Sequence, residues 1–171
     1  MATRVRAAEE RDISRLTEIY NHFVKSGAVT FDTRPSSLEE RTRWFDQFAT
    51  SGPYRLLVAE SAGSVVGYAG SMRFRTKPAY ETSVETTIYL APEWQGRGLG
   101  ARLYSALFDA LRGEDLHRAL AGITLPNEAS IRLHEGFGFR HVGVFREVGR
   151  KHGSYWDVAW FEKPLPDSAV S

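Results

Sequence analysis

The sequence lacks cysteine, long apolar runs and an excess of charge of either sign, and each absence excludes a class of protein. Without cysteine there is no disulfide framework, no thiolate nucleophile and no cysteine-based zinc site, and the composition suits a reducing compartment. No apolar run approaches the roughly 20 residues that cross a bilayer as a helix. The 22 Lys and Arg residues balance 21 Asp and Glu residues to a formal charge of +1, which argues against whole-surface binding of a polyanion.

The residues that are present match an average globular domain. Of the 171 residues, 42 % are hydrophobic and 25 % are charged. No linker, repeat or low-complexity tract divides the sequence, so we predict a single domain over residues 1–163 and a short, loose tail over residues 164–171. The first residues, MATRVRAAEERD, contain no apolar segment of the signal-peptide type, and we expect a cytoplasmic protein.

Hydrophobic periodicity predicts four helices. The first has apolar residues at i, i+3 and i+4 spacing, and the third has a leucine at every fourth position from Leu99 to Leu111. Ser37 followed by Glu40 fits a capping box at the start of the second helix, whose apolar face we assign to Leu38 and three aromatic residues. The helices are expected from about Glu9 to Gly27, from Ser36 or Ser37 in a segment that Gly52 and Pro53 close, from Leu99 to Gly113 and from Asn127 to Gly136.

Alternating patterns predict seven strands around these helices. Val84, Thr86 and Ile88 are expected on one face of the central strand, with Glu85, Thr87 and Tyr89 on the other. The strands are expected near Val5 and over Tyr54–Glu60, Val65–Arg75, Glu81–Leu90, Ala119–Ile123, Arg140–Arg150 and Ser154–Glu162. Helices that interrupt strands in this order indicate an α/β fold with a mixed sheet, covered at least partly on both faces.

The most distinctive feature is a glycine-rich turn, Gln95-Gly96-Arg97-Gly98-Leu99-Gly100, between the central strand and an amphipathic helix. Glycine allows close approach of a ligand to the backbone, and the free amides and dipole of a helix N-terminus favour an anion such as a pyrophosphate. Arg97 adds a possible charged contact. The turn therefore indicates a site for a phosphorylated cofactor.

Other interpretations of this turn fit less well. A nucleotide-binding P-loop requires Gly-Lys-Ser/Thr, whereas this sequence continues with Ala101-Arg102. A dinucleotide-binding turn follows the first strand of its unit and has an acidic residue some 20 positions later, and the spacing here differs. A glycine-rich turn that binds nothing is the remaining alternative.

Several segments resemble the GNAT acyltransferase superfamily and, within it, the phosphinothricin N-acetyltransferase-like branch that includes methionine sulfoximine and methionine sulfone acetyltransferases. The pattern Gln-x-x-Gly-x-Gly resembles the superfamily's acetyl-CoA loop, and the resemblance extends over nearly the whole chain. The segments that resemble the branch are Val84-Glu85-Thr86-Thr87-Ile88-Tyr89, Leu125-Pro126-Asn127 with Ser130, Leu133-His134-Glu135, Gly138-Phe139, and Lys151-His152-Gly153 with Asp157. The resemblance implies a GNAT-like mixed, mostly antiparallel sheet of about seven strands flanked by about four helices.

The resemblance also implies an activity and a co-substrate. It implies transfer of acetyl from acetyl-CoA to the α-amino group of a small amino-acid-like substrate of the phosphinothricin, methionine sulfoximine or methionine sulfone type, without a metal. The residues that it assigns to acetyl-CoA are Ile88, Tyr89, Leu90, Gln95, Gly96, Arg97, Gly98, Leu99, Gly100, Ala101, Asn127 and Ser130. Asn127 also suits a helix N-cap, and the two roles are compatible.

Acetyl transfer requires an unprotonated amine and a protonated leaving thiolate, and two residues are candidates for these tasks. Glu85 resembles the branch's catalytic glutamate, and a carboxylate facing the cleft suits a general base. A structural carboxylate paired with an arginine is the alternative. His134 stands where many GNAT enzymes have a tyrosine, and imidazole is suited to donating a proton or holding the sulfur. A hydrogen-bonded histidine on a helix face is the alternative.

Substrate contacts are expected from five residues. The basic and aromatic segment 72–80 contains Arg73 and Arg75, which suit a substrate carboxylate or phosphinate. This segment is about two residues longer than the branch's usual form, and an exposed basic hairpin end is the alternative. The remaining candidates are Phe31, Thr86 and Tyr155.

A homodimer is expected for the assembly, and no nucleic acid or membrane partner is expected. A protein N-terminal or polyamine acetyltransferase is the alternative within the enzyme class, and the arginines of segment 72–80 count against a cationic polyamine. A CoA-binding sensor without turnover is the alternative outside it. Loss of Glu85 distinguishes the two classes. A sensor would keep its ligand-dependent signalling, whereas an enzyme would lose acetylation and keep cofactor binding.

Overall fold

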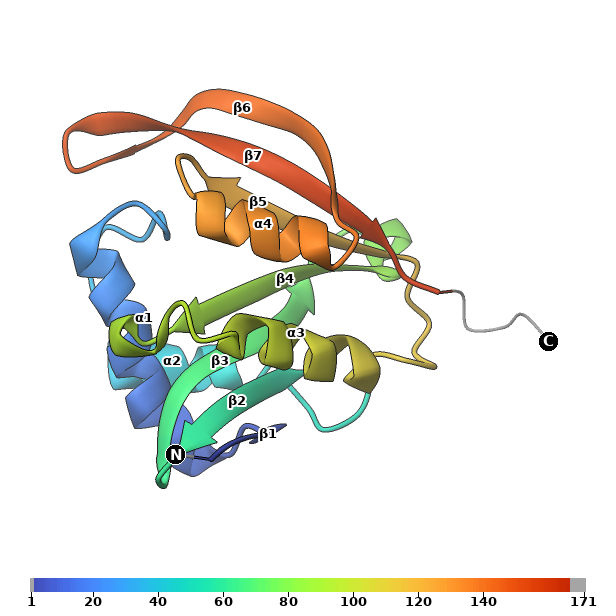
Figure 1. Ribbon diagram of the computed structural model, residues 1–171. Coiled ribbons are helices and arrows are strands. Elements are labelled where there is room, and N and C mark those ends of the chain that lie inside the picture. The colour runs from blue at the N-terminus through green and yellow to red at the C-terminus, as the bar shows by residue number, and fades with distance from the viewer. Residues whose placement is uncertain (1, 167–171) are drawn as a thin grey trace.

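Seven strands form one sheet with the order β1-β2-β3-β4-β5-β7-β6 in the computed structural model, which describes residues 2–166 (Figure 1). The strands are β1 (Thr3–Ala7), β2 (Leu56–Ser61), β3 (Ser64–Arg73), β4 (Ser83–Leu90), β5 (Arg118–Thr124), β6 (Arg140–Lys151) and β7 (Ser154–Pro164). All neighbours pair antiparallel except β4 and β5, which are parallel. The predicted mixed, mostly antiparallel sheet is confirmed.

Four helices accompany the sheet, as predicted. They are α1 (Ile13–Ser26), α2 (Leu38–Phe45), α3 (Leu99–Ala110) and α4 (Glu128–Gly136), and short 3-10 turns occupy Glu10–Asp12, Pro78–Tyr80 and Pro92–Trp94. The capping box of α2 is confirmed: the amide of Glu40 donates to Ser37 Oγ at 3.1 Å, and the amide of Ser37 donates to the Glu40 carboxylate at 2.8 Å.

Some boundaries differ from the prediction. The turn at Pro78–Tyr80 delays the start of β4 to Ser83, and α2 ends at Phe45, well before Gly52 and Pro53. Leu38 is 55 % exposed, so its place in the apolar face of α2 was wrong. It lies in the first turn of a short helix, where the capping box fixes the chain without burying the side chain.

The C-terminal part of the sheet extends slightly past the predicted domain end. Strand β7 includes Pro164, and Leu165 is buried with its amide donating to the carbonyl of His117 at 3.0 Å. The rest of the expected tail, from residue 167, lies outside the described residues. Within residues 2–166, no helix has the length and apolar character to cross a membrane.

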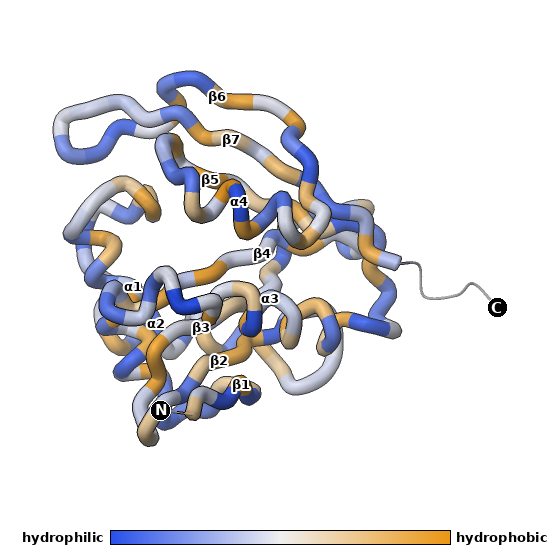
Figure 2. Tube along the Cα trace, viewed as in Figure 1, coloured by the Kyte–Doolittle hydropathy of each residue, from blue (hydrophilic) through white to orange (hydrophobic). Residues whose placement is uncertain are grey.

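The two faces of the sheet carry separate hydrophobic clusters because side chains alternate along each strand. On β2, Leu57 and Ala59 face the cluster that includes α3, while Leu56 and Val58 face the cluster that includes α1. Figure 2 shows hydrophobic residues gathered along β2 and β3 in the middle of the sheet. The helices α1 and α2 therefore cover one face and α3 covers the other.

The sheet opens between β4 and β5. These strands pair only where Ser83–Glu85 meets Arg118–Leu120, although β4 continues to Leu90 and β5 to Thr124. Beyond Glu85, β4 remains paired with β3 on one side only, while β5 remains paired with β7. The resulting fork, visible to the left of α4 in Figure 1, exposes one edge of β4 within the molecule.

Candidate active site

Backbone amides of β4 point into the fork. The amide of Ala91 donates to the carbonyl of Val66 on β3, and no register shift interrupts the pairing of these strands. Because hydrogen-bonding direction alternates along an antiparallel strand, the amides of Leu90 and Ile88 face away from β3. Two donors thus lie along the open edge of β4, on residues that the resemblance assigns to acetyl-CoA.

The glycine-rich turn places a helix N-terminus beside this edge. Gly98 is the N-cap residue of α3 and has φ of +73°, in the left-handed region that glycine adopts without strain. The amides of the first helical turn have no partner within the helix and carry the positive end of its dipole. This end of α3 therefore suits a phosphate group.

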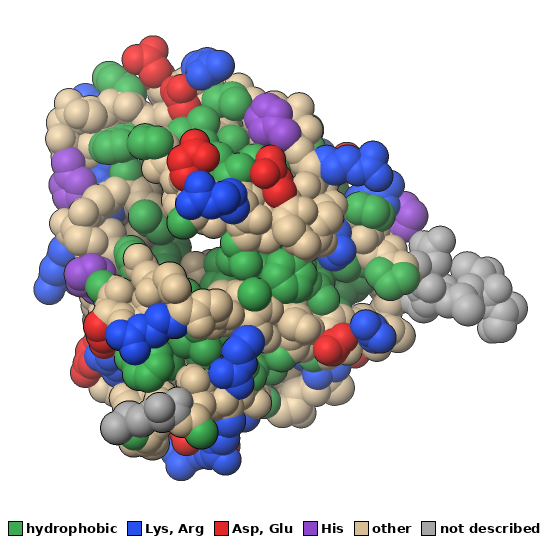
Figure 3. Space-filling view, in the orientation of Figure 1, with side chains coloured by type: hydrophobic (Ala, Val, Ile, Leu, Met, Phe, Trp, Pro, Cys, Tyr) green, Lys and Arg blue, Asp and Glu red, His purple; other side chains and the backbone are tan. Residues whose placement is uncertain are grey.

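A cleft of about 560 Å³ joins the edge of β4 to the N-terminal ends of α3 and α4. Figure 3 shows the hollow near the middle of the view, with hydrophobic side chains along its rim. Of the residues assigned to acetyl-CoA, those that line the cleft are Ile88, Tyr89, Leu90, Gln95, Gly96, Gly98, Leu99, Gly100, Ala101, Asn127 and Ser130. Arg97 is not among them, and its guanidinium lies 5.0 Å from the centre of the Trp94 ring.

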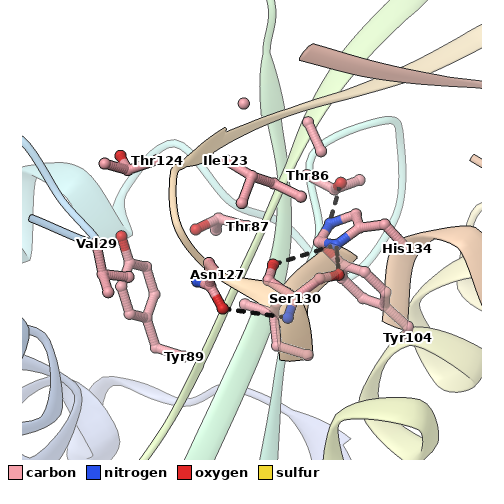
Figure 4. Close-up of a pocket in the computed structure, with 13 residues that line it drawn as sticks. Val29, Thr86, Thr87, Tyr89, Tyr104, Ile123, Thr124, Asn127, Ser130 and His134 are labelled. Atoms are coloured by element: carbon pink, nitrogen blue, oxygen red, sulfur yellow. Dashed lines mark hydrogen bonds between the residues drawn. The ribbon is translucent and has the colours of Figure 1, made fainter. Parts of the chain in front are cut away.

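The α4 side of the cleft is fixed by a helix cap. Asn127 Oδ1 accepts a hydrogen bond from the amide of Ser130 at 3.2 Å, which confirms Asn127 as the N-cap of α4. Ser130 lines both the cleft and a smaller cavity of about 60 Å³ between β4 and β5 (Figure 4). The two spaces therefore meet at Ser130.

Glu85 stands at the branch point of the fork, since it is the last residue of β4 that pairs with β5. Its side chain is half-buried, on the same face of β4 as Thr87 and Tyr89. Burial raises the pKa of the Glu85 carboxyl above its ordinary value, while the charge of Arg75 opposes that shift. A carboxylate with a raised pKa is a stronger base than an exposed one, which suits proton abstraction.

His134 is buried, and both ring nitrogens are hydrogen-bonded (Figure 4). Nδ1 lies 2.7 Å from the carbonyl oxygen of Ser130, and Nε2 lies 2.8 Å from the hydroxyl of Tyr104. Because a carbonyl only accepts, the neutral ring carries its proton on Nδ1 and accepts from Tyr104 at Nε2. Burial lowers the pKa of His134, and the Ser130 carbonyl opposes that shift. His134 is thus neutral at neutral pH.

Sequence reasoning missed Tyr104, which completes this network. The residue is fully buried on α3, and its hydroxyl lies 3.3 Å from that of Thr86. Burial raises the pKa of the Tyr104 hydroxyl well above its ordinary value, so it remains protonated. In the sequence Tyr104 belongs to a leucine-rich helix face and resembles ordinary core. Thr86, predicted to contact substrate, lines the smaller cavity with its side chain on the α3 face.

The other predicted substrate residues lie around the far end of β4 and on the β6–β7 hairpin. Arg73 lies 3.9 Å from Glu81, and Arg75 stacks 4.9 Å from the centre of the Phe74 ring. The charge of Arg75 reaches Glu85, as its effect on that carboxyl shows. Neither arginine lines the cleft or the smaller cavity.

Phe31 and Tyr155 are held away from β4. The Phe31 ring lies against Gly149 on β6 and leaves no room there for a β-carbon. The buried Lys151 holds the same loop by donating to the carbonyl of Thr30 at 2.8 Å. Tyr155 is 59 % exposed on β7. The loop between α1 and α2 is therefore joined to the β6–β7 hairpin.

A further cavity of about 270 Å³, which sequence reasoning missed, lies on the α1–α2 face of β4. Its wall includes the buried guanidinium of Arg41. Tyr89 lines this cavity, the cleft and the smaller cavity alike, so all three spaces adjoin one residue. The signal in the sequence was poor, because Arg41 lies in a charged helix that also contains the exposed Arg43.

A metal site is not evident in the described part of the chain, because no three His, Asp or Glu side chains in residues 2–166 gather closely enough to hold an ion. The polar groups of the site are instead backbone amides, hydroxyls, one carboxylate and one imidazole.

Comparisons with known proteins agree with this geometry. The acetyltransferase (GNAT) domain family matches residues 5–160. A phosphinothricin N-acetyltransferase from Streptomyces coelicolor is 60 % identical over 94 % of this chain and 95 % of its own length. A methionine sulfoximine/methionine sulfone acetyltransferase from Salmonella typhimurium is 36 % identical over 97 % of this chain and 96 % of its own length.

A solved structure gives the same answer at the level of the fold. The phosphinothricin acetyltransferase from Sinorhizobium meliloti, solved in complex with acetyl-CoA, superposes with a TM-score of 0.91 at 34 % identity, covering all of this chain and 92 % of that one. The resemblance to the superfamily and to its phosphinothricin branch is confirmed. The fork in the sheet, the glycine-rich turn and these relatives lead to one conclusion: the chain belongs to the GNAT acetyltransferase family.

Proposed function

We propose that this protein transfers acetyl from acetyl-CoA to the α-amino group of a small amino-acid-like substrate, such as phosphinothricin, methionine sulfoximine or methionine sulfone. The observation that carries the proposal is the fork between β4 and β5: Glu85, a carboxylate with a raised pKa, stands at its branch point, and three residues further along β4 begins a cleft that ends at the N-terminus of α3. The names of the relatives from Streptomyces coelicolor and Salmonella typhimurium support the substrate class.

Acetyl-CoA fits the cleft in one direction. Its pyrophosphate would accept hydrogen bonds from the first-turn amides of α3, where the helix dipole adds to the attraction. Its pantetheine arm would then run along the open edge of β4 towards Ile88 and Leu90. The apolar wall of the cleft, which includes Phe23 and Leu133, suits the methylene groups of that arm.

Glu85 is the general base in this proposal. The acceptor amine must lose a proton before it attacks the thioester carbonyl, and the Glu85 carboxylate would take that proton. Along an extended strand Glu85 and Ile88 are about 10 Å apart, so the amine or a water molecule lies between the carboxylate and the thioester. A base with a raised pKa implies that kcat/KM falls as the pH decreases through that value.

The amides of the open edge would stabilise the oxyanion. Attack of the amine breaks the carbonyl π bond and leaves a negative oxygen, towards which an amide of Ile88 or Leu90 would donate. Collapse of this intermediate expels the CoA thiolate. These donors are fixed by the pairing of β4 with β3, so they need no reorganisation during the reaction.

His134 would supply the proton that the thiolate takes up. Nδ1 lies 3.4 Å from the Ser130 hydroxyl, and Ser130 lines the cleft. The ring is mainly neutral at neutral pH, so the proton would come from its minor protonated form, pass through that hydroxyl to the sulfur and leave the ring in its neutral resting state. The lowered pKa of His134 makes its protonated form a stronger acid, in keeping with this role.

Arg73, Arg75, Phe31, Thr86 and Tyr155 remain our candidates for substrate contacts, with Arg75 supported by its charge effect on Glu85. A homodimer is proposed as well, because the β6–β7 hairpin exposes a group of large apolar side chains. They are Val142, Phe145, Val148 and Tyr155. We expect the dimer to act in the cytoplasm, in keeping with the absence of cysteine.

Thiol release from acetyl-CoA tests the proposed function. The panel of acceptors contains phosphinothricin, methionine sulfoximine, methionine sulfone, a peptide with a free N-terminus and a polyamine. We expect turnover on the amino acids, with Glu85→Gln lowering kcat by about 10²- to 10⁴-fold at unchanged acetyl-CoA affinity. Tight acetyl-CoA binding without turnover on any amino acid would contradict the substrate class.

A further inference from the structure

Arg41 is a buried cation without an anionic partner. The residue is 5 % exposed, its Nε atom makes no hydrogen bond, and Nη2 reaches only the hydroxyl of Tyr68 at 3.4 Å. Within residues 2–166 Arg41 forms no ion pair. The two carboxylates that border its cavity are engaged elsewhere: Glu40 pairs with Arg34, and Asp32 accepts a hydrogen bond from Tyr20.

Two aromatic rings lie against the guanidinium of Arg41. Its central carbon lies 3.5 Å from the centre of the Trp44 ring and 4.3 Å from the centre of the Tyr20 ring. Ring contacts occupy the faces of a guanidinium, whereas its N–H donors lie around the edge. The rings therefore hold Arg41 in place and leave donors for another group.

The missing group has a definite chemistry. A buried charge is expensive unless it is paired and hydrogen-bonded, and the planar fork of a guanidinium matches two oxygens of one anion. Carboxylate and phosphinate groups both present such a pair of oxygens. The cavity of about 270 Å³ beside Arg41 suits a small molecule that carries one of these groups.

The cavity lies beside the reacting groups. Thr87 and Tyr89 line the cavity from the face of β4 that also carries Glu85. Met72 of β3, which pairs directly with Glu85, lines it as well. Residues two apart on a strand are separated by about 7 Å, so the Glu85–Thr87 spacing is comparable to the length of a small amino acid. The acetyl-CoA cleft reaches Tyr89 as well.

We propose that this cavity is the anion subsite of the acetyl acceptor, in which Arg41 grips a carboxylate or phosphinate while the α-amino group faces Glu85. The identity of the ligand as the acceptor depends on the proposed function, whereas the anion subsite itself does not. Arg41 is thereby a specificity-determining residue on α2, separate from the basic segment that contains Arg73 and Arg75.

Equilibrium binding tests this subsite without requiring turnover. Calorimetric titrations of phosphinothricin into the full chain saturated with CoA would compare the wild type with Arg41→Gln and Arg41→Lys. Loss of a hydrogen-bonded charge contact predicts a Kd about 10- to 100-fold weaker for Arg41→Gln and an intermediate loss for Arg41→Lys. The matched control is Arg43→Gln, two residues away on α2, whose side chain is 68 % exposed.

Two further ligands identify which anion is bound. Methionine sulfone retains the α-carboxylate but has a neutral side chain, and its carboxamide lacks both anions. A loss for phosphinothricin alone would assign the phosphinate to Arg41. A loss for phosphinothricin and methionine sulfone, with no loss for the carboxamide, would assign the α-carboxylate. Either pattern supports the subsite.

Three results would overturn it: no binding of either anionic ligand by the wild type, unchanged binding in Arg41→Gln, or an equal loss for all three ligands. If Arg41→Gln fails to fold, as judged by melting temperature and acetyl-CoA affinity, a fluorescence titration of the wild type tests the subsite instead. Ligand at Arg41 must change the fluorescence of Trp44, and Trp44→Phe must remove that change. Binding without acetylation would refute only the proposed transfer, whereas acetylation without dependence on Arg41 would refute only the subsite.

Discussion

Two sparsely exposed arginines, one on the edge strand β1 and one on helix α2, have opposite surroundings. Arg6 on β1 donates to both oxygens of Asp12 at 2.7 and 2.9 Å and to Glu60 at 2.8 Å. Arg41 on α2 contacts two aromatic rings and one hydroxyl, and has no carboxylate partner in residues 2–166. A protein whose own acids satisfy a buried cation gains stability there, while an unsatisfied one is available for a ligand.

The same difference separates the two halves of the sheet. From β1 to β3 the strands pair along their lengths, and polar groups bond to one another. From β4 to β5 the pairing stops after Glu85, and the amides of Ile88 and Leu90 face open space. The first half therefore bonds its polar groups internally, whereas β4 leaves backbone donors along an open edge.

The largest effect that would sharpen this comparison is expected from Asp12→Asn. The substitution removes the bidentate partner of Arg6 and leaves it with Glu60 and, at 4.0 Å, Glu9. We expect the free energy of unfolding to fall by about 2 to 4 kcal/mol, measured by denaturant titration. Because the fork is untouched, kcat per folded molecule should not change. The exposed pair partner Glu18 provides the control, since Glu18→Gln should change stability by less than about 1 kcal/mol.

The same variant should alter the pH dependence of stability. Burial alone would raise the pKa of Asp12, but the hydrogen bonds from Arg6 and from the Glu9 amide outweigh it and leave the pKa below the ordinary value of 3.8. A lowered folded-state pKa contributes stability that is present above the unfolded value and is lost as the pH falls through the folded value. The wild type should thus lose stability more steeply below about pH 4 than Asp12→Asn does.

An intermediate effect is expected from His134→Phe, which leaves the hydroxyl of Tyr104 without its closest partner. An unsatisfied buried hydroxyl costs about 1 to 3 kcal/mol. If His134 protonates the thiolate, kcat of the wild type falls as the pH rises through a pKa below the ordinary 6.5, and the variant lacks that limb. Tyr104→Phe keeps the imidazole and should keep the limb. An unchanged profile in His134→Phe would reduce the residue to a structural role.

The smallest effect is expected from Gly98→Ala. Alanine at a φ of +73° is strained by about 1 kcal/mol, which melting would detect. Acetyl-CoA affinity should weaken several-fold as well, because Gly98 caps the helix end to which we assign the pyrophosphate in the proposed function. The control is Gly27→Ala, at an extended φ of 170° with open space around it. Equal losses of acetyl-CoA affinity in both variants would show that the helix end beside the open edge of β4 has no special part in binding, and would break the comparison.

Local patterns made much of this structure predictable. The capping box at Ser37 and the glycine-rich turn before Leu99 depend on residues adjacent in sequence, so they could be identified directly. The cofactor cleft followed from the turn and from the resemblance, and most of the residues assigned to it line it.

What could not be predicted depends on contacts between distant segments. The fork arises because β5 separates from β4 after Leu120 and stays paired with β7 alone. No pattern within β4 reveals where its pairing with β5 ends. Arg41 looks like a member of an exposed charged helix until α1 and β3 bury it under Tyr20 and Tyr68. Tyr104 looks like core until α4 brings His134 to its hydroxyl.

Tyr89 borders all three spaces of the site, and its ring packs against Tyr20, Phe23 and Tyr68 at centroid distances of 5.4 to 5.5 Å. A side chain that forms a wall for both donor and acceptor cannot adjust to one without presenting a changed surface to the other. Occupancy of the two sites is then thermodynamically linked: whatever factor acetyl-CoA applies to the affinity for the amino acid, the amino acid applies to the affinity for acetyl-CoA. In the proposed arrangement, Tyr89 is the side chain through which binding of acetyl-CoA and binding of the amino acid are coupled.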